Sequence, residues 1–562
     1  MTGSWIWLIL IAAVVNGQQT GSHPDWPRWC GKPYQPGYPN FDPGGQTLPP
    51  AVVPGPRLIH VQFQPRYSLY LDGEQYGEFI VNAELSQYHG LPWPNSSSSS
   101  KGANKLVFSI NLVEDDEPLV QNTVSINTKG SLFSFELSRL GKPRLEPIPV
   151  VLYGAPEGGV PTFTVTGSLS YLPEKTNGSV TRIDNLHGGL WVRNAASKRT
   201  FTPFFPYGFY ASYDGFLRNN DTSLIQRTYT SLGLNAMTPL TTYFDAPAML
   251  DYMSQTNLRF MYDLREGYKN LSYVRANTLA ARDLDGLFAY WTADEPDGWQ
   301  DPFFAPLAAY DLIRALDPYH PVGVVLNCQN YYFGPYSAAA GFLMADVYPI
   351  GINSTYSKWG TPCNETYGDC GCDNCGGIVQ DVVSRLEDWN RYETWLGRWR
   401  KTRLFNPQAF HGEDYWLRDP SAGESWVMVM LAVNHGAQGI ISWVWPTSDV
   451  LAGAHGALAK VLTSTEVAGF VVGGDGPGRI DVEVPGTDVV DVARWVVDGK
   501  MLVSVVNGGY VDVDSVEVSV PNATVIESTP WGSVDWKLEG ESLSVALLPA
   551  LATSLVVVDL RG

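Results

Sequence analysis

The sequence predicts a multidomain α/β protein with a central (β/α)₈ barrel of the TIM type, flanked by an N-terminal β-sandwich and a small C-terminal β-sandwich. Three observations support this fold class. The chain has 562 residues, which is too long for one ordinary domain. Apolar strand-like runs alternate with helical segments in its middle part, whereas both flanks contain short strands broken by turns. Hydrophobic residues make up 44% of the chain and charged residues 17%, as in well-packed globular domains.

The N-terminus has the pattern of a secretory signal. Residues 5–15 form an apolar run that ends in compact residues at Val15 and Gly17, and the run is too short to span a bilayer. No Lys or Arg precedes it, so only the α-amino group supplies positive charge. We predict a signal peptide at 1–17, export from the cell, and a Pro/Gly-rich linker or tail at 18–56 that Cys30 ties down.

Sequons and cysteines are consistent with an extracellular glycoprotein. Four cysteines cluster within 363–375, a spacing that zinc could also use, but an even count in an oxidising compartment favours disulfides over a metal site. Six cysteines allow fifteen pairings, so the connectivity stays open. The cysteines are Cys30, Cys328, Cys363, Cys370, Cys372 and Cys375, and the seven N-x-S/T sequons lie at Asn95, Asn177, Asn220, Asn270, Asn353, Asn364 and Asn522.

Short alternating strands predict the two sandwiches. The N-terminal one is expected over 57–187, with strands near 58–63, 78–82, 105–112 and 162–167. The C-terminal one is expected over 469–562. Its final apolar stretch, 543–560, lacks the polar spacer of a lipid-anchor signal, so we predict a terminal strand there.

Eight strand candidates between 188 and 468 predict the barrel, because eight parallel strands close a barrel of this kind. The cysteine-rich insert falls between the sixth and seventh strands, on the side where barrel loops carry function. The predicted strands are 203–210, 234–239, 258–264, 286–293, 322–327, 342–348, 404–410 and 438–445, and the predicted helices are 224–232, 247–256, 271–282, 303–316, 378–400 and 423–435.

The C-terminal ends of these strands carry acids, tyrosines and tryptophans, which suit sugar chemistry. Aromatic rings stack on sugar faces, and carboxylates handle hydroxyls and the glycosidic oxygen. The net charge of −20 argues against nucleic acid and anionic membranes as partners, and no phosphate-binding loop is evident. Candidate substrate-binding residues are Tyr210, Asp263, Trp291, Tyr348, Gln408, His411, Trp443 and Trp445.

The region 188–465 resembles the clan A glycoside hydrolases. The likeness is carried by Pro203-Phe-Phe-Pro-Tyr-Gly-Phe-Tyr210, Asp294-Glu295-Pro296, Gln408-Ala-Phe-His-Gly-Glu413 and the closing 436–446 segment. It implies that Glu295, at the end of strand four, is the catalytic acid/base. It also implies a nucleophilic Glu at the end of strand seven, where this chain has Gln408, and an amide cannot be a carboxylate nucleophile.

The second catalytic group therefore has three candidate explanations. Glu413 could reach the site from its loop, Asp346 on strand six could act as base in an inverting mechanism, or the group is absent and the barrel only binds sugar. Asp294 is expected to raise the pKa of Glu295 by repulsion. Alternatively, Asp294 caps a helix and Glu295 forms an ion pair.

Other site residues have equally plain alternatives. Asp263 would hold a substrate hydroxyl or pair with Arg265, and His411 would orient a carboxylate or be a satisfied loop histidine. Trp443 and Trp445 alternate on one strand, so both could face the interior, or one could be a sugar platform and the other a core residue.

We conclude from the sequence that the chain is a secreted O-glycoside hydrolase acting on extracellular or cell-wall polysaccharide, with Glu295 as proton donor and no cofactor or metal. The alternative is a non-catalytic carbohydrate-binding or wall-associated glycoprotein. A structural surface glycoprotein is a third possibility.

Overall fold

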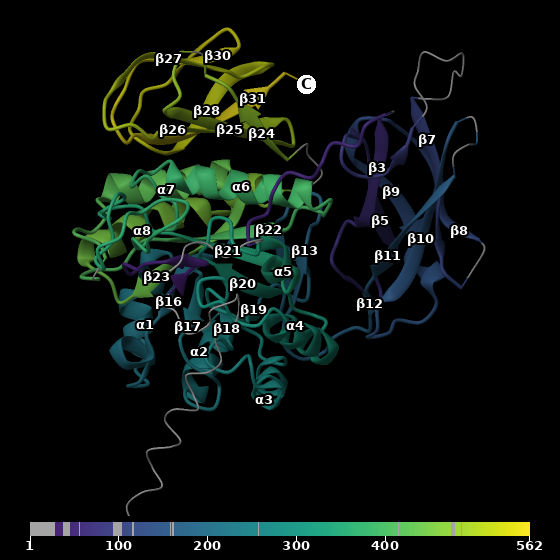
Figure 1. Cartoon of the computed structure of the whole chain (residues 1–562), viewed down its shortest axis with the longest axis horizontal. Helices are drawn as coiled ribbons and strands as arrows, with labels where there is room; N and C mark the ends of the chain where they lie inside the picture. The colour runs from purple at the N-terminus through teal and green to yellow at the C-terminus, as the bar shows by residue number, and fades with distance from the viewer. Residues whose placement is uncertain are drawn as a thin grey trace, which may run out of the picture.

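The computed structural model describes residues 28–37, 45–55, 57–93, 104–114, 117–157, 159, 162–256, 258–413, 415–473, 478–484 and 486–561. The predicted signal peptide and the Asn95 sequon lie outside these ranges. Figure 1 shows a barrel with a sandwich of C-terminal strands above it and a sandwich of N-terminal strands to its right. The predicted fold class is confirmed.

The eight predicted barrel strands all exist and close in sequence order, each parallel to the next. The first is shorter than predicted because Pro206 lacks an N–H and interrupts the run, which leaves residues 202–204 in another sheet. The strands are β16 (Tyr207–Ala211), β17 (Ala236–Pro239), β18 (Arg259–Asp263), β19 (Leu287–Trp291), β20 (Val322–Leu326), β21 (Phe342–Val347), β22 (Thr402–Pro407) and β23 (Ala437–Trp445).

Helices surround the barrel, as its buried, near-continuous apolar strands require. All six predicted helical segments contain a helix; α5, α8 and α9 were not predicted. Glu424 closes a capping box with Ser421 at the start of α7, a structural role for that acid. The helices are α1 (Thr222–Thr228), α2 (Pro247–Thr256), α3 (Leu271–Ala281), α4 (Phe304–Leu316), α5 (Phe333–Ala338), α6 (Asp381–Trp395), α7 (Ala422–Asn434), α8 (Asp449–Leu462) and α9 (Thr465–Val471), with short turns η1 (Leu137–Leu140), η2 (Tyr213–Leu217) and η3 (Thr230–Leu232).

The N-terminal sandwich consists of two antiparallel four-stranded sheets around one apolar core. Burial alternates along β3, as expected for a strand with one face on the core. One sheet has the order β6 (Leu91–Pro92), β3 (Leu58–Pro65), β5 (Tyr76–Ser86) and β9 (Thr128–Glu136), and the other β11 (Phe163–Leu169), β10 (Ile148–Pro156), β7 (Lys105–Leu112) and β8 (Pro118–Ser125).

The C-terminal sandwich lies against α7, and residues such as Trp495, Leu502 and Leu555 join the apolar cluster around the barrel. The final apolar stretch forms β30 and β31, as predicted. The sheets are β24 (Arg479–Val482), β25 (Val490–Val497), β26 (Lys500–Asn507), β31 (Thr553–Leu560) and β28 (Ala523–Trp531), and β27 (Val513–Ser519), β30 (Ser542–Leu548) and β29 (Lys537–Glu539).

Three small sheets complete the fold. One of them packs Leu190, Val192 and Phe204 into the apolar cluster of the barrel interior, and so helps to fill the barrel from the end where its strands begin. The pairs are β1 (Arg28–Trp29) with β2 (Lys32–Pro33), and β4 (Tyr70–Leu71) with β12 (Tyr171–Leu172); the triple is β13 (Val180–Ile183), β14 (Leu190–Arg193) and β15 (Thr202–Phe204).

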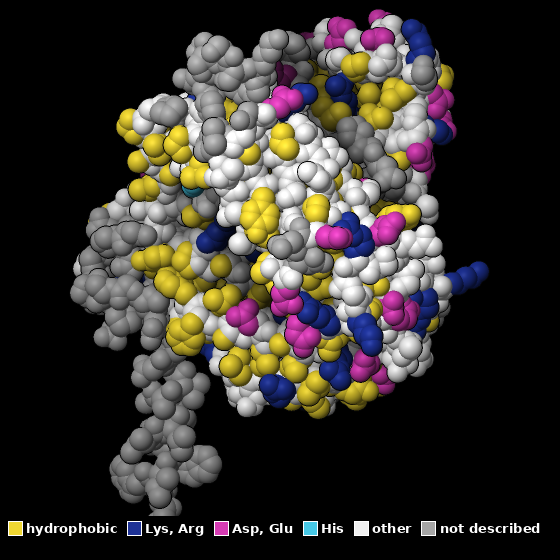
Figure 2. Space-filling model, turned by 90° about the vertical axis from the view of Figure 1, so that its right-hand side faces the viewer, with side chains coloured by type: hydrophobic (Ala, Val, Ile, Leu, Met, Phe, Trp, Pro, Cys, Tyr) yellow, Lys and Arg dark blue, Asp and Glu magenta, His cyan; other side chains and the backbone are white. Residues whose placement is uncertain are grey.

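The surface is mixed in charge. On the face in Figure 2, acidic and basic side chains are interspersed rather than gathered into one field. Among the described residues, no helix has the length and apolarity that a bilayer crossing requires.

Candidate active site

Glu295 follows β19 in an unusual backbone conformation. Its φ of 47° lies in the left-handed region, which costs a non-glycine residue about 1–3 kcal/mol. Two backbone hydrogen bonds hold it there, because its N–H donates to the Val325 carbonyl over 3.1 Å and its carbonyl accepts from Trp299 over 3.0 Å. A strained residue held in place at the mouth of a barrel is typical of a functional site.

The Glu295 carboxyl group is hydrogen-bonded to that of Asp346 at the end of β21. Burial, followed by the charges of Asp294, Asp346 and Asp297, raises the pKa of Glu295 well above its usual value. Burial and then Asp294 raise the pKa of Asp346 to about 8. The Asn406 amide donates to Asp346 Oδ1 over 2.7 Å. Burial and mutual repulsion thus disfavour the ionisation of both carboxyls at once.

Arg265 holds two more carboxylates beside this pair. Its Nε lies 3.3 Å from Asp263 and its guanidinium 3.6 Å from Asp294, and its backbone N–H also donates to Asp263. Burial raises the pKa of Asp263 to about 7 and that of Asp294 to about 6, although Arg265 opposes both shifts. Of the two predicted roles for Asp263, the structure contains the ion pair with Arg265. Asp294 also forms an ion pair with Arg265. The structure thus gives this carboxyl an ion-pair role in place of the predicted helix-capping role.

Three aromatic rings line the barrel interior next to the carboxyls. Tyr210 packs on Trp291 and Trp443, with ring centroids 4.7 and 5.3 Å apart, and its hydroxyl accepts from Asn406 over 2.8 Å. Trp291 is fully buried, whereas Trp443 is half-buried and so within reach of solvent. Trp443 is thus the ring best placed to contact a bound molecule.

Trp445 lies elsewhere. It packs on Phe209, Phe216 and Tyr229 in the layer between the barrel and its helices. The pairing of β16 with β23 shifts register between Phe209 and Ala211, so the simple alternation that would place both tryptophans inside does not hold. The structure therefore has one interior tryptophan and one core tryptophan on this strand.

Tyr348 is buried two residues after Asp346, and its hydroxyl is hydrogen-bonded to the Asp346 carboxyl. Burial, followed by the charges of Asp346 and Glu295, raises the pKa of Tyr348 well above its usual value, so this phenol is a neutral donor. Its ring is held edge-on by Phe410 at 5.2 Å.

Strand seven brings no carboxylate to the cluster. Gln408 is fully buried, and its side-chain amide both donates to and accepts from the backbone of Ile350, over 2.9 and 3.0 Å. This is a structural clamp between two loops. Glu413 is exposed on the loop beyond, and the exposed His411 bonds Asp419 over 2.6 Å, so neither lies among the described contacts of Glu295.

Three residues at the site were not predicted. Asn406 precedes Gln408 by two positions, so the alternation of the predicted strand 404–410 placed both on one face, a signal that the sequence contains. Asn327, after β20, donates from Nδ2 to Glu295 Oε1 over 2.9 Å. Trp29 donates to Asn327 Oδ1 over 2.8 Å, and nothing local in the sequence indicates that contact.

All six cysteines are paired: Cys30 with Cys328, Cys363 with Cys370, and Cys372 with Cys375. The first pair joins the N-terminal segment to the loop after β20, with 5.5 Å between Cα atoms. Every described sequon asparagine is exposed to solvent, as glycan attachment requires. These are Asn177, Asn220, Asn270, Asn353, Asn364 and Asn522.

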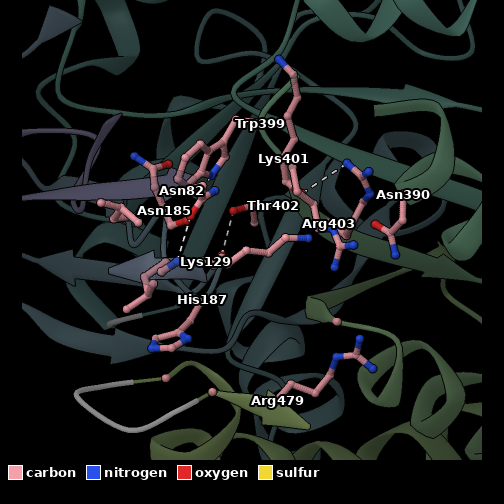
Figure 3. A pocket seen from close by; sticks show the side chains of 18 of the residues that line it. Asn82, Lys129, Asn185, His187, Asn390, Trp399, Lys401, Thr402, Arg403 and Arg479 are labelled. Atoms are coloured by element: carbon pink, nitrogen blue, oxygen red, sulfur yellow. Dashed lines mark hydrogen bonds between the residues drawn. The ribbon is translucent and has the colours of Figure 1, made fainter. Parts of the chain in front are cut away.

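A separate cavity of about 460 Å³ lies where the barrel strands begin, away from the carboxyl cluster. Figure 3 shows its wall, with Lys129 from the N-terminal sandwich, Arg403 from the barrel and Arg479 from the C-terminal sandwich. All three of these cations form ion pairs, because Lys129 pairs with Glu84, Arg403 with Glu393 and Arg479 with Asp481. The cavity thus lies at the junction of three domains.

No protein-family model matches the chain, and no curated protein sequence matches it. Among solved structures, a GH30 endoxylanase from Clostridium papyrosolvens C71 is 11% identical, over 63% of this chain and 96% of its own, with a TM-score of 0.39. A putative beta-galactosidase from Bacteroides fragilis is 10% identical over 87% and 69%, with a TM-score of 0.34. An FMN-binding beta-glucuronidase from Facaelibacterium prausnitzii L2-6 is 8% identical over 89% and 70%, with a TM-score of 0.33. These are similarities too distant to assign an activity, so the function must be argued from the site.

Proposed function

We propose that the chain is a secreted glycoside hydrolase that cleaves O-glycosidic bonds of extracellular or cell-wall polysaccharide, with Glu295 as the general acid. The observation that carries this proposal is the contact between the buried carboxyl groups of Glu295 and Asp346 at the C-terminal end of a closed (β/α)₈ barrel. Glycoside hydrolysis needs one protonated and one ionised carboxyl group on the same substrate, and this pair supplies both.

The chemistry assigns distinct roles to the pair. Glu295, whose pKa is raised well above its usual value by burial and by three neighbouring acids, keeps a proton for the leaving oxygen. Asp346, fixed by Asn406 and Tyr348, is the second carboxylate.

The separation of the two groups favours retention of configuration. An inverting pair stands about 6.5–9.5 Å apart to admit a water, and a retaining pair about 5–5.5 Å apart. The contact between the Glu295 and Asp346 carboxyls is nearer to the retaining arrangement than to the inverting one. We therefore assign Asp346 as nucleophile rather than as the base of an inverting mechanism.

A second function, carbohydrate binding without catalysis, is favoured by strand seven, where Asn406 brings an amide to the carboxyl cluster and the amide of Gln408 is bound to the Ile350 backbone. The half-buried Trp443 would serve either function as a ring for sugar stacking.

A screen of the purified protein on a panel of polysaccharides separates the two. We expect release of reducing ends by the wild type and a loss of at least about 10³-fold in kcat for both Glu295→Gln and Asp346→Asn. The anomer formed first, followed by NMR, tests retention. Glycan binding that persists in both variants, with no reducing ends released by the wild type, would establish the binding function instead.

A further inference from the structure

The N-terminal segment Arg28–Pro33 is built into the barrel mouth. It forms the β1–β2 hairpin, and Arg28, Cys30 and Lys32 are all buried. The Cys30–Cys328 bond fixes it covalently next to Asn327. A segment that only linked two domains would not be expected to bury charged residues.

Lys32 provides a second, independent attachment. Its ammonium pairs with Asp373 in the cysteine-rich insert, and it also donates to the Asn364 carbonyl over 3.1 Å and to Asn374 Oδ1 over 3.0 Å. A buried lysine needs such partners because an isolated charge is costly to bury. The hairpin and the insert therefore hold each other over the ends of the strands.

Trp29 occupies a slot that a glycine makes possible. A Cβ at Gly298, three residues after Glu295, would lie 2.3 Å from the Trp29 ring, so any other residue there would displace it. The Trp299 ring closes the slot edge-on at 5.1 Å. In this position the Trp29 indole N–H donates to Asn327 Oδ1 over 2.8 Å.

This contact determines which way the Asn327 amide points. An indole N–H is only a donor, so it can bond the oxygen of the amide and not the nitrogen. With the oxygen directed at Trp29, the Asn327 Nδ2 donates to Glu295 Oε1 over 2.9 Å. A donor at Oε1 leaves the acidic proton of Glu295 on the other oxygen, Oε2.

We propose that Trp29 is a positioning residue of the active site, which acts through Asn327 to orient the Glu295 carboxyl group for proton donation. The inference rests on the proposed function for its catalytic meaning, whereas the contact itself can be tested without a substrate. The N-terminal hairpin is thus a component of the site, although it lies more than 250 residues from Glu295 in sequence.

Loss of the Asn327 donor has a defined sign. An N–H donated to a carboxylate favours the ionised form, so its removal raises the pKa of Glu295 further. The other groups facing Glu295 are the carboxyls of Asp294, Asp346 and Asp297 and the phenol of Tyr348, whereas Trp29 bonds Asn327 and packs on Trp299.

The experiment measures the protonation of Glu295 by carbodiimide labelling across pH, with the labelled site located by mass spectrometry. Trp29→Phe keeps a ring in the slot and removes only the N–H. We expect the midpoint of Glu295 labelling to rise by about one pH unit, because a hydrogen bond to a charged group is worth that much. The matched control is Trp299→Phe, which alters the same ring pair without touching Asn327 and should leave the midpoint unchanged.

Asn327→Ala removes the amide that links Trp29 to Glu295 and leaves the hairpin intact, so it should raise the labelling midpoint as much as Trp29→Phe does. The double variant Trp29→Phe/Asn327→Ala should show no further rise. An unchanged midpoint in folded Trp29→Phe or in Asn327→Ala, or additive shifts in the double variant, would overturn the proposal. If the wild type releases sugar, Trp29→Phe should lower kcat with KM nearly unchanged. If the wild type hydrolyses no glycan, the proposed function fails while the labelling result still decides the relay.

Discussion

Arg265→Leu tests whether one guanidinium sets the charge state of the carboxyl cluster. Arg265 contacts Asp263 and Asp294 at 3.3 and 3.6 Å and lies over the rings of Trp291 and Trp443. At such distances a charge pair near a protein surface is worth about 4 kcal/mol, which corresponds to about three pH units in the pKa of the acid. Without Arg265, both acids therefore stay protonated to much higher pH.

The sign of the effect on stability follows from proton binding. In the wild type, Asp263 loses its proton near pH 7 and Asp294 near pH 6, well above the unfolded chain, so the free energy of unfolding falls with rising pH and then levels off. In Arg265→Leu the folded state keeps these protons to higher pH, so the free energy of unfolding continues to fall as the pH rises. Between pH 5 and 8.5 we expect an additional loss of about 2 kcal/mol from Asp263 and, after solvent screening of the part-exposed Asp294, about 1 kcal/mol more.

Urea unfolding followed by tryptophan fluorescence at pH 5 and 8.5 measures this difference. At pH 5 both acids are largely neutral, so only packing and the cation–π contacts are lost, about 1 kcal/mol. Arg218→Leu is the control, because its pair with Asp214 is exposed and should be worth almost nothing at either pH. Stability curves of Arg265→Leu and wild type that run parallel across this range would refute the reasoning.

The remaining predictions concern single side chains. Gln408→Glu should lower the free energy of unfolding by about 2–3 kcal/mol at pH 7, because the carboxylate cannot donate to the Ile350 carbonyl. The loss should be smaller at pH 4, where the new carboxyl is protonated, and thermal melts at the two pH values check this. Asp346→Asn removes a group whose pKa is raised to about 8, so the free energy of unfolding should fall less between pH 4 and 8 than in the wild type. Melting temperatures over that range measure this, and a slope equal to that of the wild type would contradict it. Gly298→Ala should cost about 1–3 kcal/mol and change the tryptophan fluorescence, whereas Gly453→Ala in α8, whose added Cβ meets no atom, should be neutral or stabilising.

The fold was predictable because its signals are local. Each barrel strand is a buried apolar run, and each predicted helix has its own periodicity or cap, so eight strands could be counted from the sequence. The short α5 has only six residues, too few for a periodic pattern. Pro206 was visible in the sequence, but it was included in the first strand although proline cannot extend a buried ladder.

The site was predictable where an acid lies at the end of a strand or just beyond it. Asp263, Asp294, Glu295 and Asp346 meet this condition, and the structure brings them together. Asn327 directly follows β20 but is an amide and was not singled out, and its contact with Trp29 joins residues 298 positions apart beside a disulfide. Glu413 was a candidate because it is the first Glu after strand seven, but it stands exposed while a buried amide clamp occupies the strand end.

The position of the Asp346 carboxyl group has a geometric explanation. Asp346 and Asn406 are direct register partners on the neighbouring strands β21 and β22. Adjacent strands are about 4.8 Å apart, so an acid on strand six lies one strand spacing from the place that a strand-seven acid would occupy. An acid at 406 would add a further negative charge beside Asp346 and Glu295, whereas the amide donates to Asp346 and to Tyr210. The Asn406 amide on strand seven therefore stabilises the buried Asp346 carboxyl on strand six.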